Sequence, residues 1–203
     1  MSDVVRMPMF PLSVVLLPGA ALPLHIFEDR YRALMRDLLA GDDAMRFGIP
    51  PILRGREVGG GDERCETATV VHAIDPRVAA DGRFTLVAAA VGRVEITEWL
   101  PDDPYPQAFV RPLVDNADWS DAVALDDLAR RADELAHLAG VELPGDLNLV
   151  EDPAAVSFAL GALLPIADLD RLALLRSRDP MERCRLLMGA IDDAEAVLKF
   201  RES

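Results

Sequence analysis

Histidine and cysteine side chains, which could bind a metal, are few and widely separated in this chain. They are His25, His72, His137, Cys65 and Cys184. Cys65 and His72 could meet in a folded chain, but a zinc site needs three or four converging ligands. No Cys-x-x-Cys pair occurs, so both cysteines are interpreted as thiols outside any disulfide, with Cys184 on a buried helix face. We expect no metal and no other cofactor.

Glycines and paired carboxylates give no clearer sign of catalysis. The glycines at 59–61 could bind phosphate, but no helix start follows them, and Asp62-Glu63 would repel an anion. A hairpin loop is the better interpretation. The side chains of the neighbouring pairs Asp102-Asp103 and Asp192-Asp193 diverge and form no acid–base pair. The sequence therefore predicts no catalytic residues.

The N-terminal apolar residues are divided by Pro8, Pro11, Pro18 and Pro23. Each proline fixes φ and lacks a backbone donor, so these segments are predicted to be short strands rather than one helix. Pro18-Gly19 predicts a turn into a strand at 22–26. An amphipathic helix is then predicted near 28–40, because apolar residues recur at helical spacing from Tyr31 to Leu38 and acidic residues occupy the first turn.

Strand-length segments continue to about residue 115. Among them are 70–74 and 84–89. Asp81-Gly82 predicts a hairpin between two of them, and Asp75-Pro76 is interpreted as another turn. Residues 1–115 are therefore predicted to form a mostly antiparallel β domain with one helix.

After residue 116 the apolar spacing becomes helical. Ser120 is a predicted helix cap, followed by the apolar positions Leu125, Leu128, Ala132, Leu135 and Ala139. Asp126–Arg130 and Asp127–Arg131 are expected four-residue ion pairs. Asp152-Pro153 and Asp179-Pro180 predict two further helix starts, with a short helix at 169–175 between them. The helix after Asp152 is apolar on all sides, so it is expected to be central in a bundle.

Residues 116–203 are thus predicted to form a bundle of about four helices packed on the β domain, giving an α+β chain. The junction at 115–120 is short, lacks Gly and Pro, and contains Trp119. A free linker would be longer and richer in Gly, Ser or Pro. We therefore expect the halves to unfold as one cooperative unit, with Trp119 packed between them.

The N-terminal pattern FPL…VLLPG…LPL.IFE.RYR.L…LL, from Phe10 onward, resembles the opening of the Lon protease N-terminal, substrate-binding domain. Later strands of the same family are resembled by Arg46-Phe47-Gly48-Ile49, by 67–74, by Gly92-Arg93-Val94-Glu95-Ile96 and by 105–113. The resemblance covers about 113 residues and implies a PUA-like antiparallel β-barrel or pseudobarrel in a stand-alone Lon-domain protein. Two departures, at 65–67 and at 88–90, alter side-chain size beside the strands.

The machinery of a complete Lon protease is missing. An ATPase needs the phosphate loop GxxxxGK[ST], and this protease needs a serine activated by a lysine base. The chain has one lysine, Lys199, four residues from its end. We therefore predict that the protein is not an enzyme, although homologues carry a Lon peptidase (S16) label.

Charge argues against nucleic acid as a partner. The formal net charge is −14, and a nucleic-acid-binding surface normally carries clustered basic residues. The nearest such cluster is Arg171, Arg176, Arg178, Arg183 and Arg185. Acidic residues interleave with it, so a solvated helical surface with local ion pairs is the preferred interpretation.

Membrane partners are also not expected. The prolines interrupt any signal-peptide-like apolar run, and the longest uncharged stretch, 153–167, is too short to span a bilayer. The sequence predicts a cytoplasmic protein.

Two functional hypotheses remain. The resemblance implies a non-catalytic module that binds unfolded or apolar polypeptide segments as an adaptor or regulator, with a protease as an optional further partner. Its candidate contact residues are Phe10, Leu12, Phe27, Tyr31 and Phe47, which lie near strand ends and the predicted helix. Core packing is the alternative for each and is preferred for Phe27 and Phe47. The second hypothesis is a small-molecule enzyme or sensor that uses a cleft between the two halves. The oligomeric state is left open.

Overall fold

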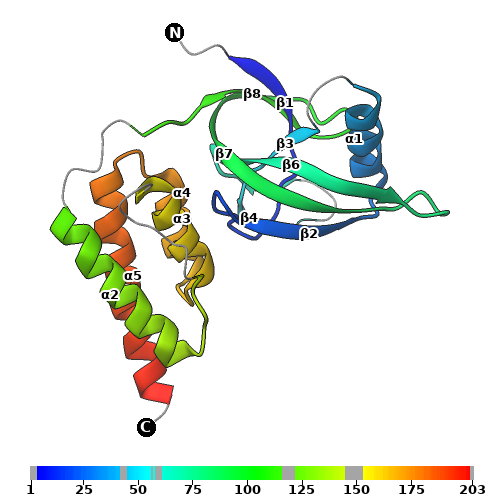
Figure 1. Cartoon of the computed structure of the whole chain (residues 1–203). Coiled ribbons are helices and arrows are strands. Elements are labelled where there is room, and N and C mark those ends of the chain that lie inside the picture. Colours follow the sequence, from blue (N-terminus) through cyan, green and yellow to red (C-terminus); the bar gives the residue numbers. More distant parts are fainter. Residues whose placement is uncertain are drawn as a thin grey trace. The chain divides into compact units, whose positions relative to one another are not determined.

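The computed structural model describes residues 4–41, 45–55, 57, 61–115, 122–144 and 153–201, and it contains two compact units (Figure 1). Met1–Leu113 is called the β unit and Val114–Ser203 the helical unit. The expectations about Ser120, Trp119 and Asp152 fall outside the described residues. An antiparallel sheet followed by helices confirms the predicted α+β class.

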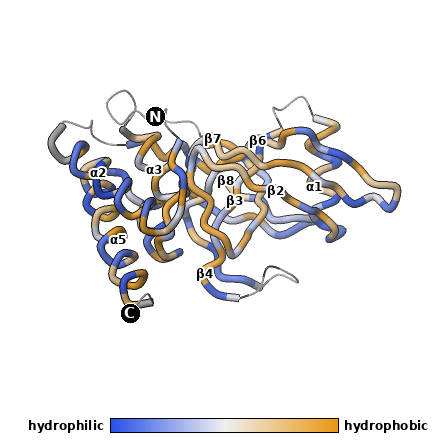
Figure 2. The backbone as a smooth tube through the Cα atoms, turned by 60° about the horizontal axis from the view of Figure 1, so that its bottom comes forward, coloured by the Kyte–Doolittle hydropathy of each residue, from blue (hydrophilic) through white to orange (hydrophobic). Residues whose placement is uncertain are grey.

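The β unit is built on one six-stranded sheet. Its strands are β1 (Val5–Pro8), β2 (Ala21–Ile26), β3 (Arg46–Ile49), β6 (Thr67–Val78), β7 (Phe84–Leu100) and β8 (Gln107–Pro112). The order is β1-β8-β7-β6-β3, β2 also pairs with β7, and all these pairings are antiparallel. A separate pair joins β4 (Ile52–Arg54) to β5 (Glu63–Arg64). Figure 2 shows hydrophobic residues concentrated along these strands.

Strand β7 is one strand of 17 residues, so the expectation of two separate strands at 84–89 and 92–96 is wrong. Asp81-Gly82 forms the predicted hairpin turn, with Gly82 at φ +77°. Asp75-Pro76 is not a turn. It lies inside β6, where Asp75 has a φ of 48° and the register against β7 shifts. The chain absorbs the proline as a bulge instead of reversing direction.

The strands of the described residues do not close into a barrel, so that part of the expected fold is not confirmed. Within the described chain, the segment after β1 reaches β3 through an isolated parallel bridge, Met9–Gly48, and a second bridge joins Leu12 to Pro51. Pro8 and Pro11 flank Met9 and have no backbone donor. A continuous hydrogen-bonded ladder is therefore interrupted on both sides of the first bridge.

Helix α1 (Asp29–Ala40) confirms the helix predicted near 28–40 and covers the main core of the β unit. Tyr31, Leu34, Met35 and Leu38 are buried in that core, as their spacing predicts. The helix ends where the Gly41 amide donates to the Asp37 carbonyl oxygen at 3.0 Å.

The described part of the helical unit contains four helices. They are α2 (Ala122–Ala139), α3 (Pro153–Leu163), α4 (Asp168–Arg176) and α5 (Pro180–Arg201). The carboxylate of Asp179 caps α5 by accepting a hydrogen bond from the Met181 amide at 2.8 Å. Helix α5 contacts α2, α3 and α4, so the expectation that α3 is central is wrong. The physical reason is length, because α3 has 11 residues and α5 has 22.

Ion pairs in this unit differ from the predicted ones. Arg130 binds Asp127 and Glu134 within α2, whereas Arg131 reaches across to Asp192 and Glu195 of α5. The expected pair Asp126–Arg130 is therefore replaced by other pairs within α2, and the expected pair Asp127–Arg131 by a link between two helices.

The arginine-rich segment is not uniformly solvated. The Arg183 side chain is 0% exposed and forms two hydrogen bonds to the Asp115 carboxylate, at 2.9 and 2.7 Å. The Arg171 guanidinium donates to the carbonyl oxygen of Gly161, in the last turn of α3, and to those of Leu164 and Ile166, which follow α3. The solvated interpretation is wrong for Arg183 because a half-buried carboxylate partner, distant in sequence, accompanies it. Among the described residues, no helix has the length and apolar content needed to cross a bilayer.

Candidate functional site

Three of the five predicted contact residues are buried in the β unit. Phe10, Tyr31 and Phe47 belong to one core cluster, and the Phe10 ring centroid lies 4.2 Å from that of Tyr31 and 6.1 Å from that of Phe47. Leu12 is half-buried against the same cluster. The core interpretation of Phe47 is thereby confirmed.

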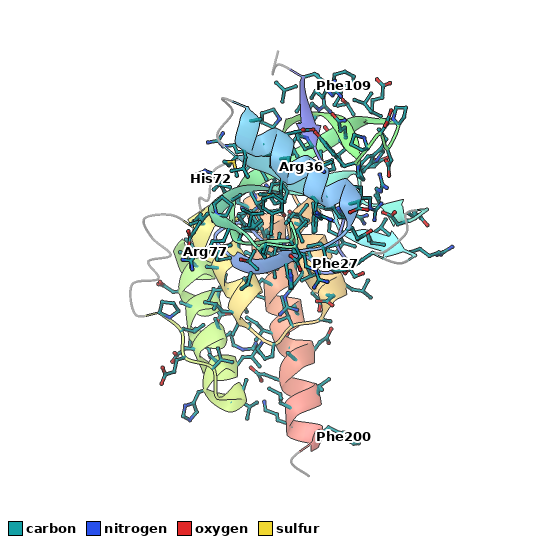
Figure 3. The ribbon with its side chains drawn as sticks, turned by 90° about the vertical axis from the view of Figure 1, so that its right-hand side faces the viewer. Phe27, Arg36, His72, Arg77, Phe109 and Phe200 are labelled. Atoms are coloured by element: carbon teal, nitrogen blue, oxygen red, sulfur yellow. The ribbon has the colours of Figure 1, made fainter. Side chains whose placement is uncertain are left out.

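Phe27 lies elsewhere and is 55% exposed, so the core interpretation preferred for it is wrong. It follows β2 directly, and its ring stands edge-on to His25 at a centroid distance of 6.5 Å (Figure 3). Phe27 points outward because it lies just beyond the end of β2, where side chains no longer alternate between the two faces of the sheet. The structure therefore does not gather the five predicted residues into one accessible surface.

A different region of the β unit offers an accessible apolar depression of about 290 Å³, which we call the sheet groove. It is lined by Val5, Met7, Arg46, Val70, Val91, Gly92, Arg93, Val94, Val110 and Pro112. These residues come from β1, β3, β6, β7 and β8, five strands of one sheet.

The sheet groove originates in a bulge of β7. Val71 pairs with Ala90 and Val70 pairs with Gly92, so Val91 is an extra residue opposite β6. Its side chain is 55% exposed. A Cβ atom placed on Gly92 would meet nothing within 4 Å, so the glycine leaves open space beside Val91.

The floor of the sheet groove is formed by side chains of a packed core cluster. Val94 and Val110 are buried in a second core cluster, and Met7 and Val70 pack against the same cluster. Close packing of such clusters holds side chains in fixed positions. An apolar ligand would therefore meet a pre-formed surface.

The charged side chains in the described lining are both arginines. Arg46 is exposed at the rim, and Arg93 is largely buried. Arginine offers five N–H donors and no acceptor. The sheet groove therefore combines an apolar floor with hydrogen-bond donors, on a chain whose net charge is −14.

Another group of polar side chains in the β unit surrounds Arg64, and ion pairs hold it together. The Arg64 guanidinium lies 2.7 Å from both the Asp62 and the Asp102 carboxylates and 4.8 Å from the centre of the Trp99 ring. Burial acts to raise the pKa of Asp62, but hydrogen bonds from Arg64 leave that pKa below its ordinary value. Burial raises the pKa of nearby Tyr31. The pKa of Asp62 is lowered and that of Tyr31 is raised, both away from neutral pH, so these two groups give no support to an acid–base enzyme.

Metal ligands do not converge in the described part of the chain, where no three His, Cys, Asp or Glu side chains are placed to share an ion. His25 and His72 lie in β2 and β6, and His137 lies on α2. Cys65 and Cys184 are both buried, and the predicted position of Cys184 on an inward helix face is confirmed.

The sequence did contain a signal for the sheet groove. An isolated glycine inside a strand pattern indicates a bulge or a close backbone approach. Gly92 is such a residue, but the sequence of the alanines at 88–90 and Val91 before it predicts a continuous strand without a bulge. Which strands would surround the bulge could not be derived from local sequence.

Comparisons with known proteins agree with this fold. The family described as the ATP-dependent protease La (LON) substrate-binding domain matches residues 6–193. The crystal structure of a Lon N-terminal domain protein from Xanthomonas campestris is similar, with a TM-score of 0.70 and 27% sequence identity, covering 91% of this chain and 98% of that one.

The N-terminal domain of the Mycobacterium avium complex Lon protease is also similar, with a TM-score of 0.62 and 18% identity, covering 93% of this chain and 99% of that one. At that identity the likeness shows the fold alone. No curated protein matches the chain.

Proposed function

This chain belongs to the family of the ATP-dependent protease La (LON) substrate-binding domain, and we propose that it is a non-catalytic module that binds apolar segments of other polypeptides. Only the Lon N-terminal domain is found in these 203 residues, with no ATPase or protease domain. The proposed role is that of an adaptor or regulator, and a protease is an optional further partner.

The observation that carries the proposal is the sheet groove. Its volume of about 290 Å³ lies at the small end of ligand pockets, which span roughly 300–1,000 Å³. It therefore suits one or two apolar side chains of an extended chain better than a large cofactor. Arg46 at the rim supplies donors for carbonyl or carboxylate groups of that chain.

The sheet groove alone is expected to bind an apolar polypeptide segment with modest affinity. Burying one Val, Leu or Phe side chain is worth about 1.5–3 kcal/mol. Since 1.4 kcal/mol is tenfold in affinity, one anchored side chain contributes roughly 10- to 150-fold. Recognition would then depend on apolar content and extended conformation more than on one sequence.

Gly92 permits a sharp test. A Cβ atom added there meets no neighbour within 4 Å, and Gly92 is not in the left-handed region, so the side chain of Gly92→Leu should extend into the groove without disturbing the core. Gly189→Leu on α5, where added atoms also meet nothing, is the matched control. Binding of fluorescein-labelled casein, followed by anisotropy, should weaken about tenfold or more for Gly92→Leu and stay unchanged for Gly189→Leu. Equal affinity of the two variants would remove the groove from the proposal.

The absence of catalysis is tested separately. Purified protein should neither hydrolyse ATP nor cleave casein above a contaminant control, because the phosphate loop and a lysine base are missing from the sequence. Turnover that persists in Lys199→Ala would reveal an unrelated active site.

A further inference from the structure

A second apolar depression lies within the helical unit, between the start of α4 and the C-terminal half of α5. We call it the helix groove. It has a volume of about 260 Å³ and is lined by Pro165, Ile166, Ala167, Asp170, Ala190, Asp193, Ala194, Val197 and Leu198. The small side chains of Ala190 and Ala194 form its floor, since both are buried. Their spacing places them on one face of α5 together with Val197.

The two helices that line the helix groove, α4 and α5, also expose large apolar side chains. Val197 is 51% exposed, and Leu169 at the start of α4 is also exposed. Phe200, one turn beyond Val197, is 84% exposed and projects from the end of α5 (Figure 3). Apolar side chains grouped beside a depression mark interaction sites more often than scattered ones do.

The charge around the helix groove is acidic. The charged side chains in its described lining are Asp170 and Asp193. On the other side of α5, Lys199 pairs with Glu195 at 2.8 Å, and Arg131 pairs with Asp192 and Glu195. Residues 114–203 contain 19 acidic and 9 basic residues, so the unit as a whole has a negative field.

These features define one kind of occupant. We propose that the helix groove is a docking site for a basic amphipathic helix of a partner protein. Its apolar residues at three- and four-residue spacing would pack along α5, and its lysines or arginines would face Asp170 and Asp193. A second copy of this chain is a poorer fit, because a symmetric pair would bring the aspartates of both copies together.

The test uses a fluorescein-labelled synthetic peptide of 18 residues, with leucines at helical spacing and lysines elsewhere, and a second peptide with glutamates in place of the lysines. We expect the lysine peptide to bind the full chain, more weakly as salt is raised, and the glutamate peptide not to bind. Asp170→Asn/Asp193→Asn should weaken binding about three- to tenfold. Asp126→Asn/Asp133→Asn, which removes the same charge from exposed positions of α2, should not.

An apolar pair of variants completes the design. Phe200→Ser should weaken binding about tenfold, whereas Phe27→Ser, another exposed phenylalanine, should leave it unchanged. Equal binding by all variants would mean non-specific attraction to an acidic protein and would overturn the proposal. Sedimentation showing a dimer that Phe200→Ser abolishes would overturn it in favour of a second copy. Gly92→Leu should not affect this binding, so the outcome is independent of the sheet groove.

Discussion

The two units of this protein each leave an apolar depression, but they form it by different means and surround it with opposite charge. In the β unit, one extra residue in β7 turns Val91 outward and leaves space beside Gly92. In the helical unit, small residues along α5 leave space beside the start of α4. Arginines line the sheet groove, and aspartates line the helix groove. Because electrostatic complementarity governs partner choice more than buried area does, the two grooves should select different partners.

The units also differ in how they use their charged residues internally. The β unit holds Arg64, whose side chain is 11% exposed, between the buried carboxylate of Asp62 and that of Asp102, which is about one-third exposed. The helical unit holds Arg183 completely buried, against Asp115, Ser157 and the Phe158 ring. Arg183 is the more deeply buried of the two arginines, and its removal also takes a charged hydrogen bond from Ser157 and leaves a cavity beside Phe158, so we expect it to contribute more to stability than Arg64 does.

Arg183→Ala is therefore expected to have the largest effect of the changes considered. It leaves the Asp115 carboxylate without its two hydrogen bonds and opens a cavity beside Phe158, so it should cost about 3–5 kcal/mol of unfolding free energy. Urea unfolding followed by far-ultraviolet circular dichroism measures this loss.

Arg64→Ala is the matched comparison in the β unit. Loss of its charged hydrogen bonds should cost about 1–3 kcal/mol. If Arg64→Ala cost more than Arg183→Ala, the contrast between the units would be lost. Near-ultraviolet and far-ultraviolet signals should shift together in both variants if the short junction at 115–120 makes the chain one cooperative unit.

Tyr105→Phe tests a polar link inside the β unit and should have an intermediate effect. The Tyr105 hydroxyl donates to the Asp37 carboxylate at 2.8 Å, and burial followed by this hydrogen bond raises the pKa of Tyr105 to about 12. Removing the hydroxyl should cost about 1–3 kcal/mol below pH 10.

The stabilisation that the Tyr105 hydroxyl provides should change with pH in a defined direction. The unfolded chain loses the tyrosine proton near pH 10, whereas the folded chain keeps it to about pH 12. The stabilisation is therefore complete below pH 10 and is lost as the pH rises through about 12. Unfolding free energies of wild type and Tyr105→Phe should converge over this range, and a constant difference would show that the hydroxyl does not hold its proton as described.

Local sequence predicted the parts of the fold that local physics determines. The apolar spacing of α1, the Asp81-Gly82 hairpin and the Asp179 cap of α5 all follow from residues close in sequence. Expectations that required distant partners were less accurate. The sequence pattern predicts a solvated surface for Arg183, because its partner Asp115 lies 68 residues away and cannot be recognised from local spacing. Arg131 likewise pairs with Asp192 and Glu195 of α5, in addition to Glu134 in its own helix.

The candidate site was harder to predict than the fold. Aromatic residues near strand ends suggested an exposed surface, but Phe10, Tyr31 and Phe47 pack against one another because the turn at Pro18-Gly19 and α1 bring them into one core. The sheet groove depends on register, since one inserted residue at Val91 changes which side chains face outward. Periodicity alone does not locate such a bulge.

The smallest effects are expected where the two grooves are most exposed. Val91→Ser and Val197→Ser each remove an apolar side chain that is already about half exposed, so each should change the unfolding free energy by less than about 0.5 kcal/mol. Val94→Ser, at the buried floor of the sheet groove, is the contrasting control and should be clearly destabilising. Thermal and urea unfolding of the three variants would measure this. If Val91→Ser or Val197→Ser were as costly as Val94→Ser, that valine would be part of the folded core and the corresponding groove would not be an available surface. Near-zero costs would instead mean that these side chains contribute little to folding, which leaves their apolar surface available for a partner.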